Sequence, residues 1–112
     1  DATIDGVVTI SAGDADSAAI GIQQADKVKT VALGSFDMNE AGLMRIKDGT
    51  QSFAIDQQPY LQGYLAVSLL AAHIDFGNTL PTFPVLTGPG IVDSSNIEPT
   101  LKGVAAGARS QS

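Results

Sequence analysis

Five polar residues follow three short apolar runs, in each case where a buried strand is predicted to end. Ser11 and Asp14 follow the first run, Asp37 follows the second, and Asp56 and Gln57 follow the third. A carboxylate can accept hydrogen bonds from two adjacent hydroxyl groups, and a glutamine amide both donates and accepts them. These residue types therefore suit a neutral ligand that carries several hydroxyl groups.

The same residues also have a purely structural interpretation, which their spacing leaves open. Asp and Gln are common in the turns after strands, and Asp14 or Asp16 is predicted to cap a helix after the first strand. The spacing alone does not decide between a ligand site and a set of caps and turns.

Other kinds of site lack the residues that they need. No cysteine is present, which excludes thiol catalysis, disulfides and cysteine-ligated metals. The one histidine, His73, has no nucleophile near it in the sequence, and Asp14-x-Asp16 lacks the glycine and glutamate of a calcium loop. We therefore expect a protein that is not an enzyme, with no catalytic residue, no metal and no cofactor.

Length and charge narrow the class of protein further. The chain has 112 residues, 44% of them hydrophobic, which is enough for the core of one small domain at most. Its net charge of −6 disfavours a nucleic-acid backbone as a partner. Neutral or cationic small ligands remain compatible with this charge.

Hydrophobic patterning supplies the elements that must position the polar residues. Strands are predicted over residues 4–10, 29–33 and 52–55, with helices over 14–27 and 40–47 between them, the second capped by Asn39. Alternation of strands and helices predicts an α/β fold with a parallel sheet, in which the ends of the strands meet at one edge.

The second half of the chain is predicted to hold one long helix. Pro59 suits the first turn of a helix over residues 59–76 that ends before Gly77, and its apolar residues are spread so widely that we expect burial on most sides. Residues 83–92, with two prolines and two glycines, are expected to be extended and bent, without forming a central strand. A weak helical pattern covers residues 101–108.

Three motifs, taken in order, resemble a known family. Gly34-Ser35-Phe36-Asp37, then Ile46-Lys47-Asp48-Gly49, then Ile55-Asp56-Gln57-Gln58-Pro59-Tyr60 resemble the C-terminal part of the sugar-binding proteins of ABC transporters, the ribose-binding-like periplasmic family. The resemblance covers about residues 4–92. It implies an incomplete type I periplasmic binding protein fold, a parallel-sheet three-layer α/β sandwich, of which this chain is a C-terminal fragment.

Members of that family have two lobes joined by three hinge crossings, with the sugar held between the lobes. The resemblance implies that residues 1–58 belong to the second lobe and that residues 59–86 supply a helix and a strand to the first lobe. Residues 87–112 are then the final crossing and the C-terminal tail.

The resemblance also assigns ligand contacts. Asp37 and Gln57 match the family's strand-end Asp and hinge Gln, which contact sugar hydroxyls. Ser11 and Asp14 stand where the family often has an Asn-Asp pair, a departure that points to a pentose other than ribose, a hexose or a sugar alcohol. Asp56 is a further candidate contact.

The implied function is capture of a monosaccharide or polyol and its delivery to an ABC transporter permease, in the periplasm or another extracytoplasmic space. A membrane-anchored lipoprotein is one form that the full-length protein can take. The alternative is the effector-binding core of a LacI-type transcription regulator, which an upstream helix-turn-helix would reveal. Because half of the cleft would be missing, we expect the fragment to bind sugar poorly. The helix from Pro59 would also lose its first-lobe partners and expose an apolar face, so we expect the fragment to self-associate or to need a companion chain.

Overall fold

The computed structural model describes residues 3–109, in which strands and helices alternate along the chain. The last three residues of the predicted tail, 110–112, and residues 1–2 of the predicted second-lobe segment lie outside the described part. The elements are β1 (Gly6–Thr9), α1 (Ala12–Gln24), β2 (Ala32–Phe36), α2 (Glu40–Asp48), β3 (Phe53–Asp56), α3 (Pro59–Phe76), β4 (Gly90–Asp93) and α4 (Ile97–Ala105).

A single mixed sheet organises the described residues. Its strand order is β1-β2-β3-β4, and β1, β2 and β3 run parallel to one another, as the alternation predicts. β4 returns antiparallel beside β3 with Ile91 opposite Ile55. The predicted α/β class is confirmed, and residues 83–92 contribute an edge strand and not a central one.

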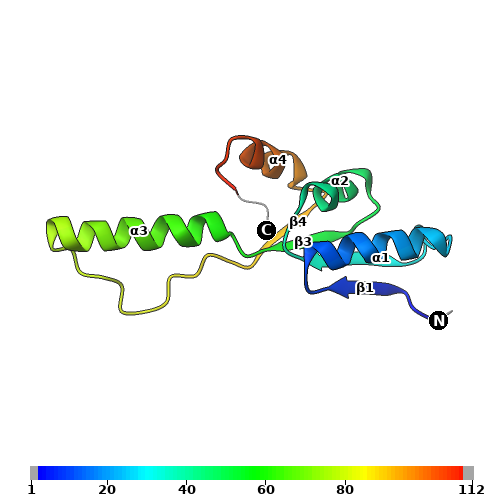
Figure 1. Ribbon diagram of the computed structural model, residues 1–112, viewed down its shortest axis with the longest axis horizontal. Coiled ribbons are helices and arrows are strands. Elements are labelled where there is room, and N and C mark those ends of the chain that lie inside the picture. The colour runs from blue at the N-terminus through cyan, green and yellow to red at the C-terminus, as the bar shows by residue number, and fades with distance from the viewer. Residues whose placement is uncertain (1–2, 110–112) are drawn as a thin grey trace.

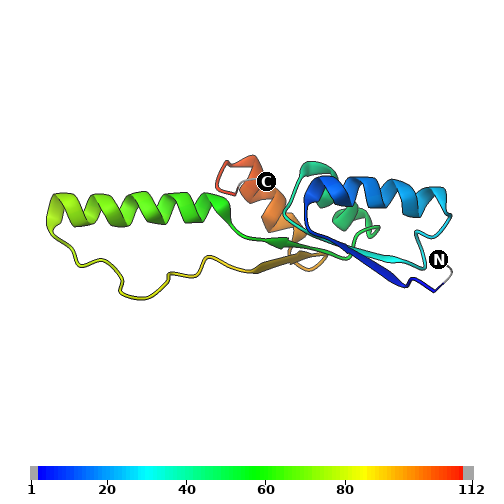
Figure 2. The same cartoon turned by 60° about the horizontal axis from the view of Figure 1, so that its bottom comes forward.

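Three helices cover one face of this sheet. α1 packs on β1 and β2, α2 packs on β3, and α4 packs beside α2 over β4 (Figures 1 and 2). The core between them is built from Met38, Leu43, Ile46, Ala54, Val92 and Ile97. Within residues 3–109 no helix covers the opposite face, so this part of the chain supplies two layers of the predicted three-layer sandwich.

The first helix begins earlier than predicted. Ser11 is its N-cap, and the Ser11 hydroxyl accepts a hydrogen bond from the backbone N–H of Asp14 at 3.1 Å. The prediction that Asp14 or Asp16 caps α1 is therefore wrong, because Ser11, in an extended conformation, already caps the helix through the N–H of Asp14. The predicted cap of α2 is confirmed, since Asn39 Oδ1 accepts from Gly42 N at 2.7 Å.

The second strand lies three residues later than predicted. Val31 N and Thr30 N both donate to Lys27 O in a turn, and pairing with β1 continues to Ser35. Gly34 fits inside this strand because the Phe53 ring lies over it, 2.4 Å from where a Cβ would be. Gly34, which was predicted to start a loop, is therefore a strand residue at which another side chain approaches the backbone closely. The shift places Asp37 directly after β2.

The long helix α3 has the predicted bounds, Pro59–Phe76, with Gly77 left-handed at its end. The burial that its apolar pattern predicts is wrong, since no residue of α3 is buried in the described structure. The exposed apolar face expected for a fragment is found, because Tyr64, Val67 and Ile74 are exposed. α3 projects away from the sheet, accompanied by the extended returning segment 77–89 (Figure 1), which makes the molecule 60 Å long and 26 Å wide. The apolar pattern of α3 therefore has no matching partner among residues 3–109.

Candidate functional site

The structure brings together Asp37 and Gln57, two of the predicted ligand residues. They follow the parallel strands β2 and β3 at the same edge, and Gln57 Nε2 donates a hydrogen bond to Asp37 Oδ1 at 2.7 Å. Gln57 is exposed and Asp37 is half-buried. A carboxylate and an amide thus stand side by side at an accessible edge, where open α/β sheets bind ligands.

Asp37 is held in an uncommon backbone conformation. Its φ of 64° is left-handed, which costs a residue other than glycine about 1–3 kcal/mol. Asp37 N donates to Ile55 O at 2.8 Å, and Asp37 O accepts from the Ser35 hydroxyl at 3.3 Å. The buried Gln51 in turn donates from Nε2 to Ser35 Oγ at 2.9 Å. These bonds fix the direction in which the Asp37 carboxylate leaves the sheet.

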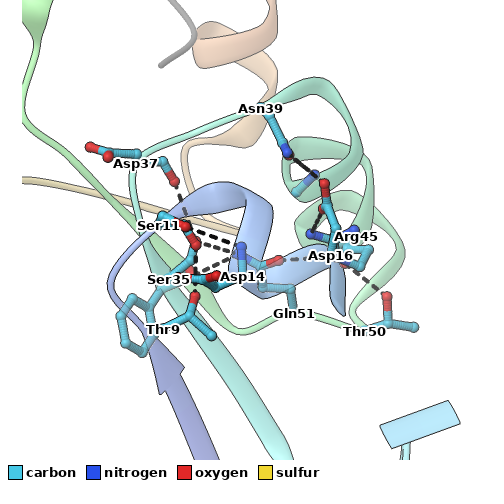
Figure 3. A network of polar contacts seen from close by, with 12 residues as sticks. Thr9, Ser11, Asp14, Asp16, Ser35, Asp37, Asn39, Arg45, Thr50 and Gln51 are labelled. Atoms are coloured by element: carbon cyan, nitrogen blue, oxygen red, sulfur yellow. Dashed lines mark hydrogen bonds and ion pairs between the residues drawn. The ribbon is translucent and has the colours of Figure 1, made fainter. Parts of the chain in front are cut away.

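A polar network continues behind Asp37 into the helices (Figure 3). Arg45 Nε donates to Gln51 Oε1 at 3.1 Å, and Arg45 Nη2 pairs with Asp16 Oδ1 at 2.7 Å. Asn39 Nδ2 donates to the other Asp16 oxygen at 2.9 Å. The network therefore joins α1, α2 and β2. Nothing in the sequence marked Arg45 or Gln51, because their links to α1 and β2 run to Asp16 and Ser35, which are distant along the chain.

Ser11 and Asp14 lie at the end of β1 (Figure 3). Thr9 Oγ1 donates to Ser11 O at 2.9 Å, which holds the turn from β1 into α1. The Asp14 side chain is exposed in the first turn of α1. No hydrogen bond within residues 3–109 links Ser11 or Asp14 to Asp37 or Gln57. Ser11 and Asp14 therefore share a site with Asp37 and Gln57 only if one ligand contacts both pairs of residues.

The structure places Asp56 apart from the other predicted contacts. Asp56 is 2% exposed and lies on the helix-covered face of β3. Its Oδ2 pairs with Arg109 Nη2 at 2.5 Å, and its Oδ1 accepts from Gln58 N at 2.8 Å. Alternation along the strand accounts for this burial, because Asp56 is two residues from the buried Ala54. Both carboxylate oxygens are thus occupied by groups of the protein.

The outgoing and returning chain segments are tied together beside Gln57. Gln58 Nε2 donates to Thr87 O, and Thr87 Oγ1 donates to Gln57 O at 3.3 Å. Gln62 Nε2 also donates to Gln57 O, at 2.7 Å. The chain therefore leaves and re-enters the sheet as a hydrogen-bonded pair of segments.

An open cavity of about 740 Å³ lies between the uncovered sheet face, α3 and the returning segment. Its lining is mostly aliphatic, and Gln57 joins it to the polar edge of the sheet. The lining residues are Phe36, Ile55, Gln57, Gln62, Leu65, Ala66, Leu69, Val85, Leu86, Thr87, Gly88, Pro89 and Ile91. Such a lining suits packing against other apolar groups better than binding of a polyol.

The electrostatics of the described residues are plain. Between Thr3 and Arg109, no cluster of three or more acidic or histidine side chains can hold a metal ion. The pKa of Asp93 is lowered from its ordinary 3.8 because the hydroxyl and N–H of Ser95 donate to its carboxylate. Asp93 faces Phe53, at the opposite end of β3 from Gln57.

None of the helices within residues 3–109 has the length and hydropathy of a transmembrane span.

Comparison with known protein families gives a match over most of the chain. Residues 1–79 match the model described as the periplasmic binding protein domain. The xylose/arabinose-binding protein XylF of Sulfolobus acidocaldarius is 35% identical over 81 residues, which are 72% of this chain and 20% of that protein. The chain thus spans about a fifth of the length of this curated relative.

Solved structures share both the fold and part of the sequence. A carbohydrate transporter from Acidothermus cellulolyticus 11B, in complex with myo-inositol, is 36% identical with a TM-score of 0.79 over 97% of this chain and 38% of that one. A solute-binding protein of an ABC transporter from Agrobacterium vitis, bound with α-D-tagatopyranose, is 30% identical with a TM-score of 0.71 over 96% of this chain and 35% of that one. These relatives are binding or transport proteins for carbohydrates and related polyols.

Proposed function

This chain belongs to the periplasmic binding protein domain family, and from that premise we propose that it works as part of an extracytoplasmic solute-binding protein for a sugar or sugar alcohol. The observation that carries the proposal is the contact between Asp37 and Gln57 at the accessible edge of the parallel strands. Xylose or arabinose, myo-inositol and tagatose, named for its relatives, all carry neighbouring hydroxyl groups.

Each proposed contact has a distinct chemical part. The Asp37 carboxylate accepts hydrogen bonds from two adjacent hydroxyls, while the Gln57 amide donates to one sugar oxygen and accepts from another. The Ser11 hydroxyl and the Asp14 carboxylate reach the ligand from the end of β1. Asp56 is left out of this set, because Arg109 and Gln58 already occupy its two oxygens.

In the proposed mechanism two lobes close over the ligand. Residues 1–58 belong to one lobe, residues 59–86 to the other, and residues 87–112 form the last crossing and the tail. Closure buries the sugar, and the closed form is the one presented to the membrane permease, so affinity includes the open–closed equilibrium. No feature of the described residues favours the alternative of a LacI-type effector-binding core.

A thermal-shift screen of the complete gene product tests the proposed function. We expect one or more pentoses, hexoses or polyols to raise the melting temperature, because a ligand that binds only the folded state stabilises it. At the same ligand concentration the shift should be smaller in Gln57→Ala, and smaller still in Asp37→Ala, in proteins that fold normally. If no member of a broad panel shifts the wild type, the proposed function is wrong; turnover of a panel sugar by the wild type would instead indicate an enzyme.

The 112-residue chain alone is expected to self-associate. Tyr64, Val67 and Ile74 of α3 are 59%, 69% and 70% exposed, which leaves an apolar helix in water. Sedimentation velocity should show dimers or larger species. Val67→Lys should shift them towards monomer, whereas Ser17→Lys, on the exposed side of α1, should not. A monodisperse wild-type monomer with a sharp cooperative melt would contradict this expectation.

A further inference from the structure

The chain segment after α4 returns to the point where β3 ends. Arg109 Nη2 pairs with Asp56 Oδ2 at 2.5 Å, and Arg109 Nη1 donates to Thr100 Oγ1 at 2.8 Å. Asp56 is 2% and Thr100 is 1% exposed, whereas the Arg109 side chain is 30% exposed, so a partly exposed arginine reaches two buried partners. Its planar fork engages a carboxylate and a hydroxyl together, which a lysine ammonium does less well.

Helix α4 leaves room for the Arg109 side chain at Gly103. Gly103 lies against it, and a Cβ at that position would be 3.0 Å from Arg109 Cδ and 3.2 Å from Cγ. A glycine inside a helix is unfavourable in itself, so its presence here is explained by the room that it gives to Arg109. The Arg109 contact is therefore built into the packing of α4.

The Asp56 carboxylate, which Arg109 holds, fixes the backbone of the next two residues. Asp56 Oδ1 accepts from Gln58 N at 2.8 Å, and Gln58 has a left-handed φ of 55° immediately before Pro59. A glutamine adopts this conformation only when other contacts stabilise it. Gln57 lies between the two residues, so the Asp56 turn sets the direction of its side chain toward Asp37.

We propose that Arg109 is a positioning residue for the ligand site: it orients Asp56, which holds the Gln57–Gln58 turn and hence both the Gln57 amide and the angle at which the chain crosses into α3. Arg109 itself makes no contact with the ligand. Its effect on binding rests on the proposed function, but its effect on the turn does not. Without Arg109, Asp56 becomes a buried charge with one partner fewer, and the turn must rearrange to expose it.

Amide hydrogen exchange in the ligand-free complete gene product tests the structural half. Arg109→Gln should speed exchange of Gln58 N–H at least about tenfold, because local opening becomes easier. Amides of the central strand, such as Leu33 and Ser35, should keep wild-type rates, which shows that the fold is intact. Lys102→Gln is the matched control, since it removes an exposed positive charge from α4 and should leave Gln58 unchanged. Unchanged exchange at Gln58 in Arg109→Gln would overturn the inference.

Calorimetric titration with myo-inositol and D-xylose tests the consequence for binding. Arg109→Gln should weaken whichever of them the wild type binds by about tenfold, and by the same factor if it binds both, since backbone position affects every ligand alike. Arg109→Lys should recover part of the affinity by restoring the charge on Asp56. Equal affinities of wild type and Arg109→Gln, or a loss confined to one sugar, would overturn the inference. A wild type that binds neither of these two nor any other member of the thermal-shift panel, with faster Gln58 exchange in Arg109→Gln, would overturn the proposed function and leave Arg109 as the support of the turn alone.

Discussion

Replacement of Asp37 by alanine is expected to weaken sugar binding by about 100-fold, because two charge-assisted hydrogen bonds are lost together. Its carboxylate stands at the accessible end of β2, 2.7 Å from the Gln57 amide. Titration calorimetry of the complete gene product, with the best ligand of the thermal-shift screen, measures the change. Gln57→Ala, which removes a neutral donor and acceptor, is expected to cost about tenfold.

Two further variants separate ligand contact from damage to the fold. Asp37→Asn keeps a side chain that tolerates the left-handed φ of 64°, so it should fold normally yet bind more weakly than wild type. Asp5→Ala removes the same charge from an exposed position before β1, at the opposite end of the sheet, and should bind like wild type. Equal losses in Asp5→Ala and Asp37→Ala would mean that net charge, and not the site, governs affinity.

The second large effect is expected in the core. Leu43 of α2 is 0% exposed and packs among Met38, Ile46 and Val92. Leu43→Ala should lower the free energy of unfolding by about 2–5 kcal/mol, because the lost apolar contacts leave a cavity. The midpoint of urea denaturation of the complete gene product, followed by circular dichroism, should fall accordingly.

The neighbouring residue provides the control for this measurement. Met44 lies on the same helix and is 43% exposed, so Met44→Ala should change the free energy of unfolding by no more than about 0.5 kcal/mol. If both variants lose the same stability, the loss does not arise from burial of Leu43 in the core, and helix propensity does not explain it either, because alanine is the best helix former. A wild-type midpoint for Leu43→Ala would contradict the packing described for α2.

Local signals in the sequence predicted the helix ends that are marked by a capping residue, a proline or a glycine. Pro59 and Gly77 gave α3 its bounds, and Asn39 gave the start of α2. β2 was misplaced because Gly34 reads as a loop residue, whereas the Phe53 ring that lies over it comes from another strand. Burial of α3, predicted from its apolar pattern, was wrong for a related reason: the pattern predicts a partner surface but does not tell which stretch of chain supplies it. Only the resemblance to a two-lobed family indicated that this partner lies outside the chain.

Only part of the candidate site could be predicted from the sequence. Asp37 and Gln57 could be placed at one edge because parallel strands end together. The support of that edge by Gln51, Arg45 and Asp16 could not be read, since it depends on pairs from separate elements. Period-two alternation from Ala54 did carry the signal that Asp56 points to the covered face, but Asp56 was grouped with the ligand residues because it stands at the end of the third apolar run.

The tie between the two chain crossings has a mechanical consequence. Gln58 and Thr87 bond the outgoing segment to the returning one, and β3 and β4 continue the pairing up to Asp56 and Gly90. Two hydrogen-bonded segments can bend together perpendicular to the plane of their hydrogen bonds. They resist sliding past each other, because sliding would break those hydrogen bonds. In the lobe closure that we propose, we therefore expect the lobe that packs against α3 to approach Gln57 by bending at these paired segments and not by sliding along them.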